Sequence, residues 1–404
     1  MKIKWTGPLI LLVASASIWS LHFFSRPVSQ KKIRNSLTEK FFSTEENSFS
    51  FKVNDELLEA KTTFNSELNK YALKLLKRFK TPFSAFAIID NNSGKIIAAG
   101  GRDRITDRES RNLAFSTTHP AASLAKIITS SALFEYSSVN PDSVFSFNGR
   151  GTTLYKYQLK DKKSKWTRNI RFERAFNYSN NVVFGKAGIR NLKAGNLLKM
   201  ANNYGFNSDF ISDIYVPHSK FDFPESQYQL AEFSSGFNKK TTISVVHAAY
   251  LSFLVTNNGE KLPLYSLESL KNENGEDVLV RKNSSVNGKA MSAESSVYVS
   301  KMMKSTVRKG TARGSFSRMR KNLHKKLVIG AKTGSITGGF PHGKHEWITV
   351  FARPKDSDDK GISVAVLNIN KEKWYVRSGF IAKKLIEYYF NNIRQEEWKK
   401  VTQN

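Results

Sequence analysis

Short apolar segments typical of β-strands lie near both ends of this 404-residue chain, and this arrangement constrains the fold most strongly. Near the start, residues 84–90 and 95–99 form two such runs around the turn-forming sequence Asn-Asn-Ser-Gly, which predicts a β-hairpin. Near the end, three further runs follow, at 327–334, 347–352 and 362–368. The region between them carries mainly helical patterns. We therefore expect an α+β fold whose single antiparallel sheet is assembled from both ends of the domain.

The amino terminus carries a long segment without charge. Residues 5–25 contain no Asp, Glu, Lys or Arg, and about 20 apolar residues suffice to cross a bilayer as a helix. A cleaved signal peptide is the alternative, because Lys2 and Lys4 precede the apolar stretch and the small residues Ala-Ser-Ala stand at 14–16. Hydrophobicity resumes after that triplet, which favours an uncleaved transmembrane anchor behind a cytoplasmic tip of residues 1–4.

Two stretches of different character separate this segment from the first hairpin. Residues 26–52 are polar, rich in serine and without clear periodicity, which is typical of a linker or stalk. Residues 55–78 carry apolar side chains at helical spacing and predict an amphipathic helix. We therefore assign 26–80 to a linker and amphipathic helix, 81–393 to the main domain, and 394–404 to a basic polar tail.

The composition is strongly basic. The chain has 64 Lys and Arg against 34 Asp and Glu, a formal net charge of +30 at pH 7, which first suggests an acidic polymer as partner. The membrane-directed segment argues against nucleic acid and favours a wall polymer or anionic lipid. Two stretches, 156–174 and 301–326, are especially basic. The spacing of their charges does not distinguish binding to a wall polymer or anionic lipid from an ordinary solvated surface. The absence of cysteine excludes disulfide scaffolds, cysteine-ligated metals and thiol nucleophiles.

The first motif with chemical meaning is Ser-Leu-Ala-Lys at 123–126, which begins an apolar run of helical length. On a helix this spacing places the amine of Lys126 one turn above the hydroxyl of Ser123. The helix amino terminus stabilises negative charge on the serine oxygen. Desolvation lowers the pKa of a lysine, so that its neutral amine can remove a proton. Together the two residues can form an activated nucleophile without histidine.

Two further motifs offer polar groups to the same chemistry. Ser179 and Asn181 stand directly after a helix-like segment and can direct a hydroxyl and an amide into one cleft. Lys332 and Thr333 lie late on a predicted strand, where a lysine can hold a carboxylate and a threonine adds a hydroxyl donor. The following Gly334 allows another chain to approach the strand backbone closely.

The three motifs, in this order, resemble the signature of the penicillin-binding transpeptidase superfamily: Ser-x-x-Lys, Ser-x-Asn and Lys-Thr-Gly. The sequences Ser-Ser-Gly at 234–236, Gly-Thr-Ala at 310–312 and His-Glu-Trp at 345–347 add to the resemblance, which extends over roughly residues 83–393. The resemblance implies a five-stranded antiparallel sheet flanked by helices, with an all-helical subdomain. It implies no metal and no organic cofactor. It also implies a serine D,D-transpeptidase of peptidoglycan synthesis, held in the bacterial cell membrane by a single pass, with the catalytic domain on the periplasmic or extracellular side.

The resemblance also implies a role for each motif residue. Ser123 would be the acylated nucleophile and Lys126 its general base. Ser179 and Asn181 would pass a proton to the leaving amine and hold the substrate amide. The backbone N–H groups of Ser123 and Ser335 would form the oxyanion hole. The terminal carboxylate of a D-Ala-D-Ala stem peptide, or of a β-lactam, would be bound by the strand residues Lys332, Thr333, Gly334 and Ser335.

Some alternatives stay open at this point. Tyr178 and Asn180 offer a second register for the middle motif, although Val-Val-Phe at 182–184 favours that of Ser179 and Asn181. The motifs do not separate a transpeptidase from a D,D-carboxypeptidase, and a β-lactamase is disfavoured because no Glu-x-x-Leu-Asn segment occurs. A non-catalytic β-lactam sensor or cell-wall scaffold is the alternative of another class. No segment resembles a glycosyltransferase, and the expected partners are peptidoglycan stem peptides, β-lactams and cell-wall synthesis proteins.

Overall fold

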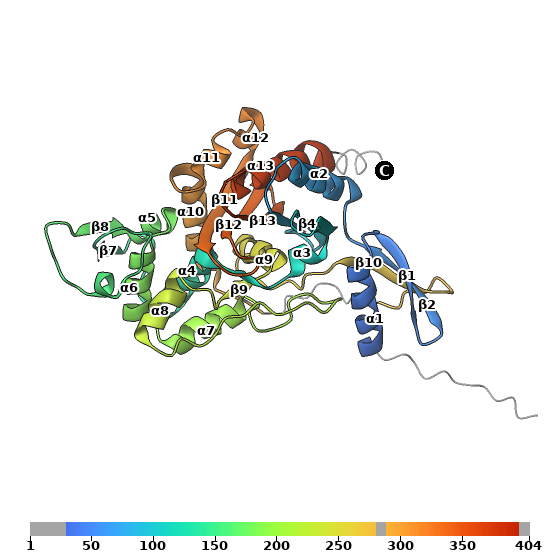
Figure 1. The fold of residues 1–404 in the computed structure, drawn as a ribbon, viewed down its shortest axis with the longest axis horizontal. Coiled ribbons are helices and arrows are strands. Elements are labelled where there is room, and N and C mark those ends of the chain that lie inside the picture. Colours follow the sequence, from blue (N-terminus) through green and yellow to red (C-terminus); the bar gives the residue numbers. More distant parts are fainter. Residues whose placement is uncertain (1–29, 280–287, 396–404) are drawn as a thin grey trace, which may run out of the picture.

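The computed structural model describes residues 30–279 and 288–395 (Figure 1). The predicted cytoplasmic tip and membrane anchor lie outside the described residues, as does nearly all of the predicted tail. Within the two described ranges, no helix is both long enough and apolar enough to cross a membrane. The anchor at residues 5–25 therefore stays a prediction.

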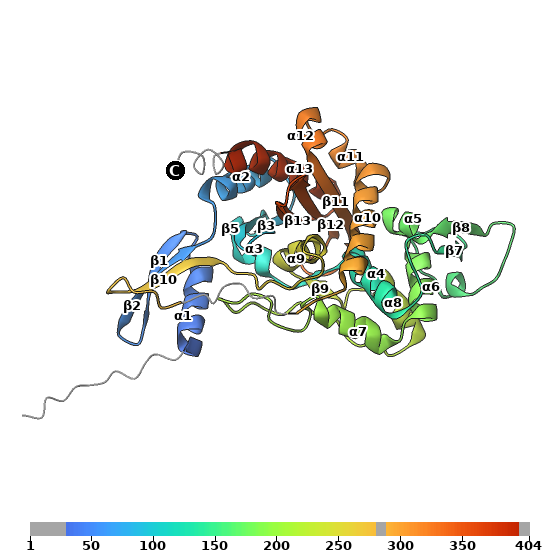
Figure 2. The ribbon, with the colours of Figure 1, turned by 180° about the vertical axis from the view of Figure 1, so that it is seen from behind.

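A six-stranded antiparallel sheet forms the centre of the fold, in the order β11-β12-β13-β3-β4-β5 (Figures 1 and 2). Its strands are β3 (Phe83–Asp90), β4 (Ile96–Asp103), β5 (Arg108–Ser110), β11 (Leu327–Thr337), β12 (Lys344–Pro354) and β13 (Ile362–Asn370). An early strand pairs with a late one, since Phe86 on β3 lies opposite Val366 on β13. The prediction of one antiparallel sheet built from both ends is confirmed. The predicted number of five strands is wrong, because the edge strand β5 has three residues and is too short to show an alternating pattern.

Both faces of the sheet are covered by helices, which explains why β13 is buried along its whole length. Side chains alternate between faces along a strand, so Ala87 and Phe86 on β3 belong to two different cores. One core includes residues of α2 (Ser66–Lys77) and α13 (Ser378–Tyr388). The other includes α9 (Val245–Thr256), a helix that is apolar around nearly its whole circumference, as an internal position requires.

A helical subdomain lies beside the sheet. Its helices are α4 (Ala125–Tyr136), α5 (Phe172–Asn177), α6 (Asn181–Asn191), α7 (Ala194–Asn203), α8 (Gln227–Ser235) and α10 (Ala293–Lys309). The first of these, α4, lies inside the subdomain, and all of its residues from Ala125 to Leu133 are buried. A 3₁₀ turn, Ala122–Leu124, leads into α4 and contacts β11, so the subdomain meets the sheet there.

Smaller elements complete the domain. One short ribbon pairs β7 (Val144–Phe147) with β8 (Arg168–Arg171), and the chain between them, with a 3₁₀ turn at Lys156–Leu159, extends away from the body at the end opposite α1 (Figure 1). The remaining elements are β6 (His119–Pro120), β9 (Thr242–Ile243), α3 (Asn112–Phe115), α11 (Arg313–Phe316), α12 (Lys321–Lys326) and a π-helical turn (Tyr389–Ile393).

The first described residues form a compact module, which corrects the expectation of a linker at 26–52. Helix α1 (Gln30–Ser43) packs on a three-stranded sheet of β1 (Ser48–Val53), β2 (Glu56–Thr62) and β10 (Leu267–Asn272). The helix escaped prediction because it buries three residues, Ile33, Leu37 and Phe41, in an otherwise polar sequence.

The predicted amphipathic helix at 55–78 is also corrected. Its first half is strand β2, and only its second half is helical, as α2. Leu58 and Ala60 are buried at the two-residue spacing of a strand. Strand β2 pairs with β1 on one side and with β10 on the other. Because β10 lies about two hundred residues further along the chain, no local pattern could indicate this second pairing.

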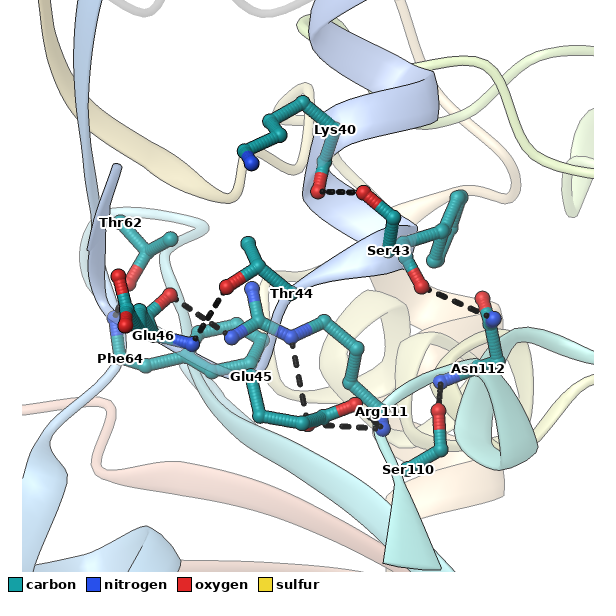
Figure 3. A network of polar contacts seen from close by, with 11 residues as sticks. Lys40, Ser43, Thr44, Glu45, Glu46, Thr62, Phe64, Ser110, Arg111 and Asn112 are labelled. Carbon is teal, nitrogen blue, oxygen red and sulfur yellow. Dashed lines mark hydrogen bonds and ion pairs between the residues drawn. The ribbon is translucent and has the colours of Figure 1, made fainter. Parts of the chain in front are cut away.

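Arg111 connects the N-terminal module to the main domain (Figure 3). Its side chain is 2% exposed, and its Nη2 donates a hydrogen bond to the carbonyl oxygen of Glu46 at 2.9 Å. The carboxylate of Glu45 lies 3.6 Å from its Nε and accepts from its backbone N–H. The guanidinium also lies 4.7 Å from the centre of the Phe41 ring. These contacts fix the turn after α1 to the segment after β5.

Candidate active site

Ser123 lies in the 3₁₀ turn before α4, where the helical subdomain meets β11. The preceding residue, Ala122, has a positive φ of 49°, a left-handed conformation that residues with a Cβ rarely adopt. Gly236, the left-handed C-cap of α8, packs against this turn. A Cβ at Gly236 would lie 1.9 Å from the carbonyl oxygen of Ala122, so only glycine fits there. The strained turn and the glycine together hold Ser123 at the start of the helix.

Lys126 is buried completely, and its Nζ lies within hydrogen-bond distance of three oxygen atoms. Its Nζ lies 2.8 Å from Ser123 Oγ, 2.7 Å from Asn181 Oδ1 and 2.5 Å from the carbonyl oxygen of Ser235. Burial lowers the pKa of Lys126 well below its ordinary value, and the charge of Lys332 nearby lowers it further. A neutral amine has a lone pair that can accept the proton of a serine hydroxyl. The two residues of the first motif are therefore in direct contact, with the lysine suited to act as a base.

Asn181 is held by contacts at both ends of its amide. Its Oδ1 accepts from Lys126, while its Nδ2 donates to the carbonyl oxygen of Thr152 at 2.9 Å. Its backbone N–H donates to the carbonyl oxygen of Gly151 at 2.6 Å. Gly151 and Thr152, which lie in the segment between β7 and β8, therefore orient the Asn181 amide that faces Lys126.

The two registers of the middle motif differ in what their side chains do. Asn180 caps α6, because its Oδ1 accepts from the backbone N–H of Val183 at 3.0 Å. Ser179 instead points towards the third motif, since its Oγ accepts from Nζ of Lys332 at 2.9 Å. The geometry favours the register of Ser179 and Asn181 over that of Tyr178 and Asn180.

Lys332 is fully buried although it lies on β11, an edge strand of the sheet. Besides Ser179, its Nζ reaches the carbonyl oxygen of Thr333 at 2.7 Å, and burial lowers its pKa to about 7. The hydroxyls of Thr333 and Thr311 lie 2.5 Å apart. A Cβ added at Gly334 would lie 3.2 Å from the backbone N of Ser123, so the missing side chain lets β11 approach the nucleophile turn.

The three motifs meet at a cavity of about 680 Å³ between the helical subdomain and the sheet, a volume typical of small-molecule sites. Of the eight residues selected from the sequence, six line this cavity: Ser123, Ser179, Asn181, Thr333, Gly334 and Ser335. The other two, Lys126 and Lys332, are buried amines hydrogen-bonded to lining hydroxyls. The structure therefore brings all eight into one site.

Sequence reasoning missed some groups that complete the site. The backbone carbonyls of Ser235 and Thr152 hold Lys126 and Asn181, and Thr311 reaches Thr333. The sequences around 235 and 311 carry a signal through the family resemblance alone. The sequence gives no signal for Thr152, because its contribution is a main-chain carbonyl oxygen, which every residue type has.

A serine beside a buried lysine at a helix start, facing an edge strand that carries a second buried lysine, defines a class of serine acyl-transfer proteins. Residues 84–387 match the family model of the penicillin binding protein transpeptidase domain. The chain belongs to this family. A search of curated proteins found no match.

Solved structures of low sequence identity share the fold. The D,D-transpeptidase domain of a peptidoglycan glycosyltransferase from Eggerthella lenta is 20% identical with a TM-score of 0.64, over 83% of this chain and 84% of that chain. PBPA from Mycobacterium tuberculosis is 19% identical with a TM-score of 0.63, over 82% of each chain. The penicillin G acyl-enzyme complex of penicillin-binding protein A from M. tuberculosis is 18% identical with a TM-score of 0.60, over 82% of this chain and 79% of that chain.

Proposed function

We propose that this protein is a serine D,D-transpeptidase that acts on the D-Ala-D-Ala end of peptidoglycan stem peptides through an acyl-enzyme on Ser123. The observation that carries the proposal is the 2.8 Å contact between Ser123 Oγ and Nζ of the fully buried Lys126. No histidine is needed in this arrangement, because a desolvated lysine can serve as the base. We assign no glycosyl transfer to the chain.

In the acylation step, Lys126 accepts the proton of Ser123 as Oγ forms a bond to the carbonyl carbon of the penultimate D-Ala. The peptide bond to the last D-Ala then breaks, and its nitrogen receives a proton through Ser179. Asn181 would hold the substrate amide. The oxyanion would be stabilised by the backbone N–H groups of Ser123 and Ser335, a role supported by the close approach of β11 to the Ser123 turn.

The terminal carboxylate of the substrate would bind at β11. Lys332 already donates to two oxygens there, and Thr333 Oγ1 lies beside Thr311 Oγ1 at the cavity wall. A substrate carboxylate would favour the charged form of Lys332, whose pKa is about 7 without a ligand. Among the residues that the structure describes, β11 is an edge strand of the sheet, and the extended backbone of a peptide can add to it.

The acceptor of the acyl group decides between related activities. An amine of a second stem peptide would attack the ester, form a new peptide bond and return a proton to Ser123. Water in place of the amine would make the protein a D,D-carboxypeptidase, and fast attack of water on a penicilloyl ester would make it a β-lactamase. The transpeptidase family match supports the first outcome.

The test is acylation by a fluorescent penicillin, followed by mass spectrometry of the adduct. We expect one adduct on the full chain, located at Ser123, lost in Ser123→Ala and kept in Ser137→Ala, a serine at the other end of α4. The same protein should release D-Ala from a pentapeptide ending in D-Ala-D-Ala and form a cross-linked product when an amine acceptor is added. Labelling of Ser123→Ala equal to wild type would contradict the proposal, and stable labelling without D-Ala release would indicate a sensor.

We further propose that residues 5–25 anchor the protein in the bacterial cell membrane, with the catalytic domain on the periplasmic or extracellular side. The uncharged length of this segment supports the proposal. Full-length protein should sediment with membranes after a high-salt wash and keep its first residues by intact mass. A soluble product that begins after Ala16 would show a signal peptide instead.

A further inference from the structure

An arm with a basic and aromatic surface extends from the helical subdomain. We call residues 148–167, the chain between β7 and β8, the arm; it reaches away from the body at the end opposite α1 (Figures 1 and 2). Its first part borders the active site, because Thr152 lines the cavity that contains Ser123. The three motifs lie elsewhere in the chain, so acyl transfer at Ser123 does not account for the exposed surface of the arm.

Buried polar groups hold the backbone of the arm in a defined shape. Gln158 is 1% exposed, and its Nε2 donates to two carbonyl oxygens of the arm, both at 3.1 Å. The carboxylate of Asp161 pairs with Arg190 and, at 3.1 Å, with Nζ of the buried Lys186, both of which lie on α6. The arm is therefore fastened to the helical subdomain, and its exposed side chains project from defined positions.

Three aromatic side chains of the arm face solvent. Trp166 is 73% exposed, Tyr157 64% and Tyr155 55%. The two tyrosine rings stack, with 5.7 Å between their centres and 10° between their planes. Large apolar surfaces that a folded protein leaves exposed mark interaction sites. A flat aromatic face packs well against the C–H face of a sugar ring, whose hydroxyls stay in contact with water.

The charge of the arm is almost entirely positive. The arm has six Lys and Arg and one acidic residue, Asp161, whose charge is already shared by two cations of α6. Its exposed lysines, for which the described part of the chain offers no carboxylate partner, are Lys160, Lys162, Lys163 and Lys165. The ammonium of Lys165 lies 5.2 Å from the centre of the Trp166 ring, so cations and aromatic faces are neighbours. This surface complements an anionic partner that also has flat apolar faces.

The position of the arm favours a glycan over a membrane as that partner. The predicted anchor ends at residue 25, and the five steps from there to Gln30, the start of α1, span at most about 18 Å. With this anchor the membrane lies near α1, whereas the arm lies at the opposite end of the molecule (Figure 1). The arm also begins at the cavity where a stem peptide would react, and stem peptides are attached to glycan strands.

We propose that the arm binds the glycan strands of peptidoglycan, with sugar rings against its exposed aromatic side chains and carboxylates of the strand against its lysines. This inference rests on the proposed function, in which the stem peptides carried by these strands are the substrate. A strand held beside the cavity raises the effective concentration of its stem peptides at Ser123. The ligand class is a polymer of N-acetylated amino sugars that bears carboxylates.

The test measures binding of glycan strands from which an amidase has removed the stem peptides, so the groups that react at Ser123 are absent. This removal leaves a carboxylate on every second sugar. Full-length Ser123→Ala protein in detergent is titrated against strands labelled at one end, and fluorescence anisotropy reports binding. We expect saturable binding, and about tenfold weaker binding at low salt of chitin oligomers of equal length, which have the N-acetylated sugar but no carboxylate.

Two arm variants separate the aromatic contribution from that of the charges. Tyr157→Ala combined with Trp166→Ala should weaken binding of both glycans at least about fivefold, because two stacking faces are lost. The triple variant Lys162→Gln, Lys163→Gln and Lys165→Gln should weaken binding of the anionic strands alone, towards the affinity of the chitin oligomers. Its effect should shrink as salt is added, since salt screens exposed charges.

The second basic stretch supplies a matched control. Helix α12 carries three exposed lysines, so Lys321→Gln, Lys325→Gln and Lys326→Gln together remove the same charge from another surface. This control should bind the strands as tightly as the parent protein. With Ser123 restored, every variant should be acylated by a fluorescent penicillin at the wild-type rate, which shows that the fold is intact.

Three results would overturn the inference. The first is undiminished strand binding by both arm variants, and the second is an equal loss of binding in the α12 control. The third is contact of the arm with lipid, measured on full-length protein in nanodiscs that contain brominated lipid. The part of the fluorescence that Trp166→Phe removes should not be quenched there, and its quenching would assign the arm to the membrane.

Failure of the proposed function gives a different result. In that case wild-type protein would release no D-Ala from a pentapeptide ending in D-Ala-D-Ala, whereas the strand titration would still report on the arm. If the proposed function holds and the inference fails, D-Ala is released and the arm variants bind strands as the parent protein does.

Discussion

Replacing Asn181 with aspartate tests whether Lys126 must be neutral to activate Ser123. The variant keeps an oxygen next to Nζ but makes it negative, and the two atoms lie 2.7 Å apart, which corresponds to about 6 kcal/mol of attraction at an effective dielectric of 20. That figure is an upper limit, and a neighbouring opposite charge ordinarily raises a lysine pKa by about 1–3 units. At fixed pH, the neutral fraction of Lys126 should therefore fall by about 10–1000-fold.

The assay is the second-order rate constant for acylation by a fluorescent penicillin between pH 6 and 10. We expect Asn181→Asp to be slower than wild type by about that factor at neutral pH, and the ratio of the two rates to approach one as pH rises, because alkali deprotonates the lysine while any loss of charge at Lys332 affects both proteins. Asn180→Asp is the matched control, since aspartate is an equally good cap for α6 and the charge lies one residue away. If Asn181→Asp reacts at the wild-type rate at neutral pH, a neutral Lys126 is not the base.

Other predictions concern Lys332, the glycine beside the nucleophile turn, and the N-terminal module. Burial lowers the pKa of Lys332 to about 7, so the protein without a ligand loses this positive charge as pH rises through that value. The rate of acylation by a penicillin that bears a carboxylate should therefore fall on the alkaline side. Lys332→Arg should not show this fall, because arginine keeps its charge. Gly236→Ala should lower the free energy of unfolding in urea by about 2–5 kcal/mol, from a positive φ and a clash with Ala122. Gly275→Ala, where φ is also positive but no atom lies within 4 Å of the added Cβ, should cost about 1–2 kcal/mol, and equal losses would disprove the clash. Arg111→Met should lower the free energy of unfolding by about 1–3 kcal/mol with unchanged acylation per folded molecule, and a loss of acylation would contradict a purely structural role.

The parts of the fold that sequence could predict are those with a local signal. The hairpin of β3 and β4 and the late strands are short apolar runs bounded by turn residues, and each lies close to its predicted position. The N-terminal module has no such signal. Its sheet depends on β10, which comes from a distant part of the chain, and Leu58 and Ala60 fit both a strand and a helix when read alone.

The site shows the same division. The side-chain groups Ser123, Lys126 and Lys332 could be selected because their residue types carry the chemistry and their order matches a family. The burial that lowers the pKa of Lys332 was not predicted, since it results from the packing of β11 within the folded domain, whereas a desolvated Lys126 was part of the expected chemistry. The part of the cavity wall formed by Arg318, Trp374, Arg377 and Lys383 was also beyond prediction, because these residues come from separate segments that only the fold brings together.

The pairing of β3 with β13 has a consequence for biosynthesis. Strand β3 leaves the ribosome early, yet the strand that covers its free edge is β13, which is made near the end of the chain. The same holds for β2, whose second neighbour β10 is made only after helix α9. The central sheet can close only after β13 has been made, and the N-terminal sheet only after β10, and exposed strand edges are sites of association between chains. Messages truncated before the codon for Ile362 should therefore yield protein that aggregates through β3 rather than a shorter folded domain.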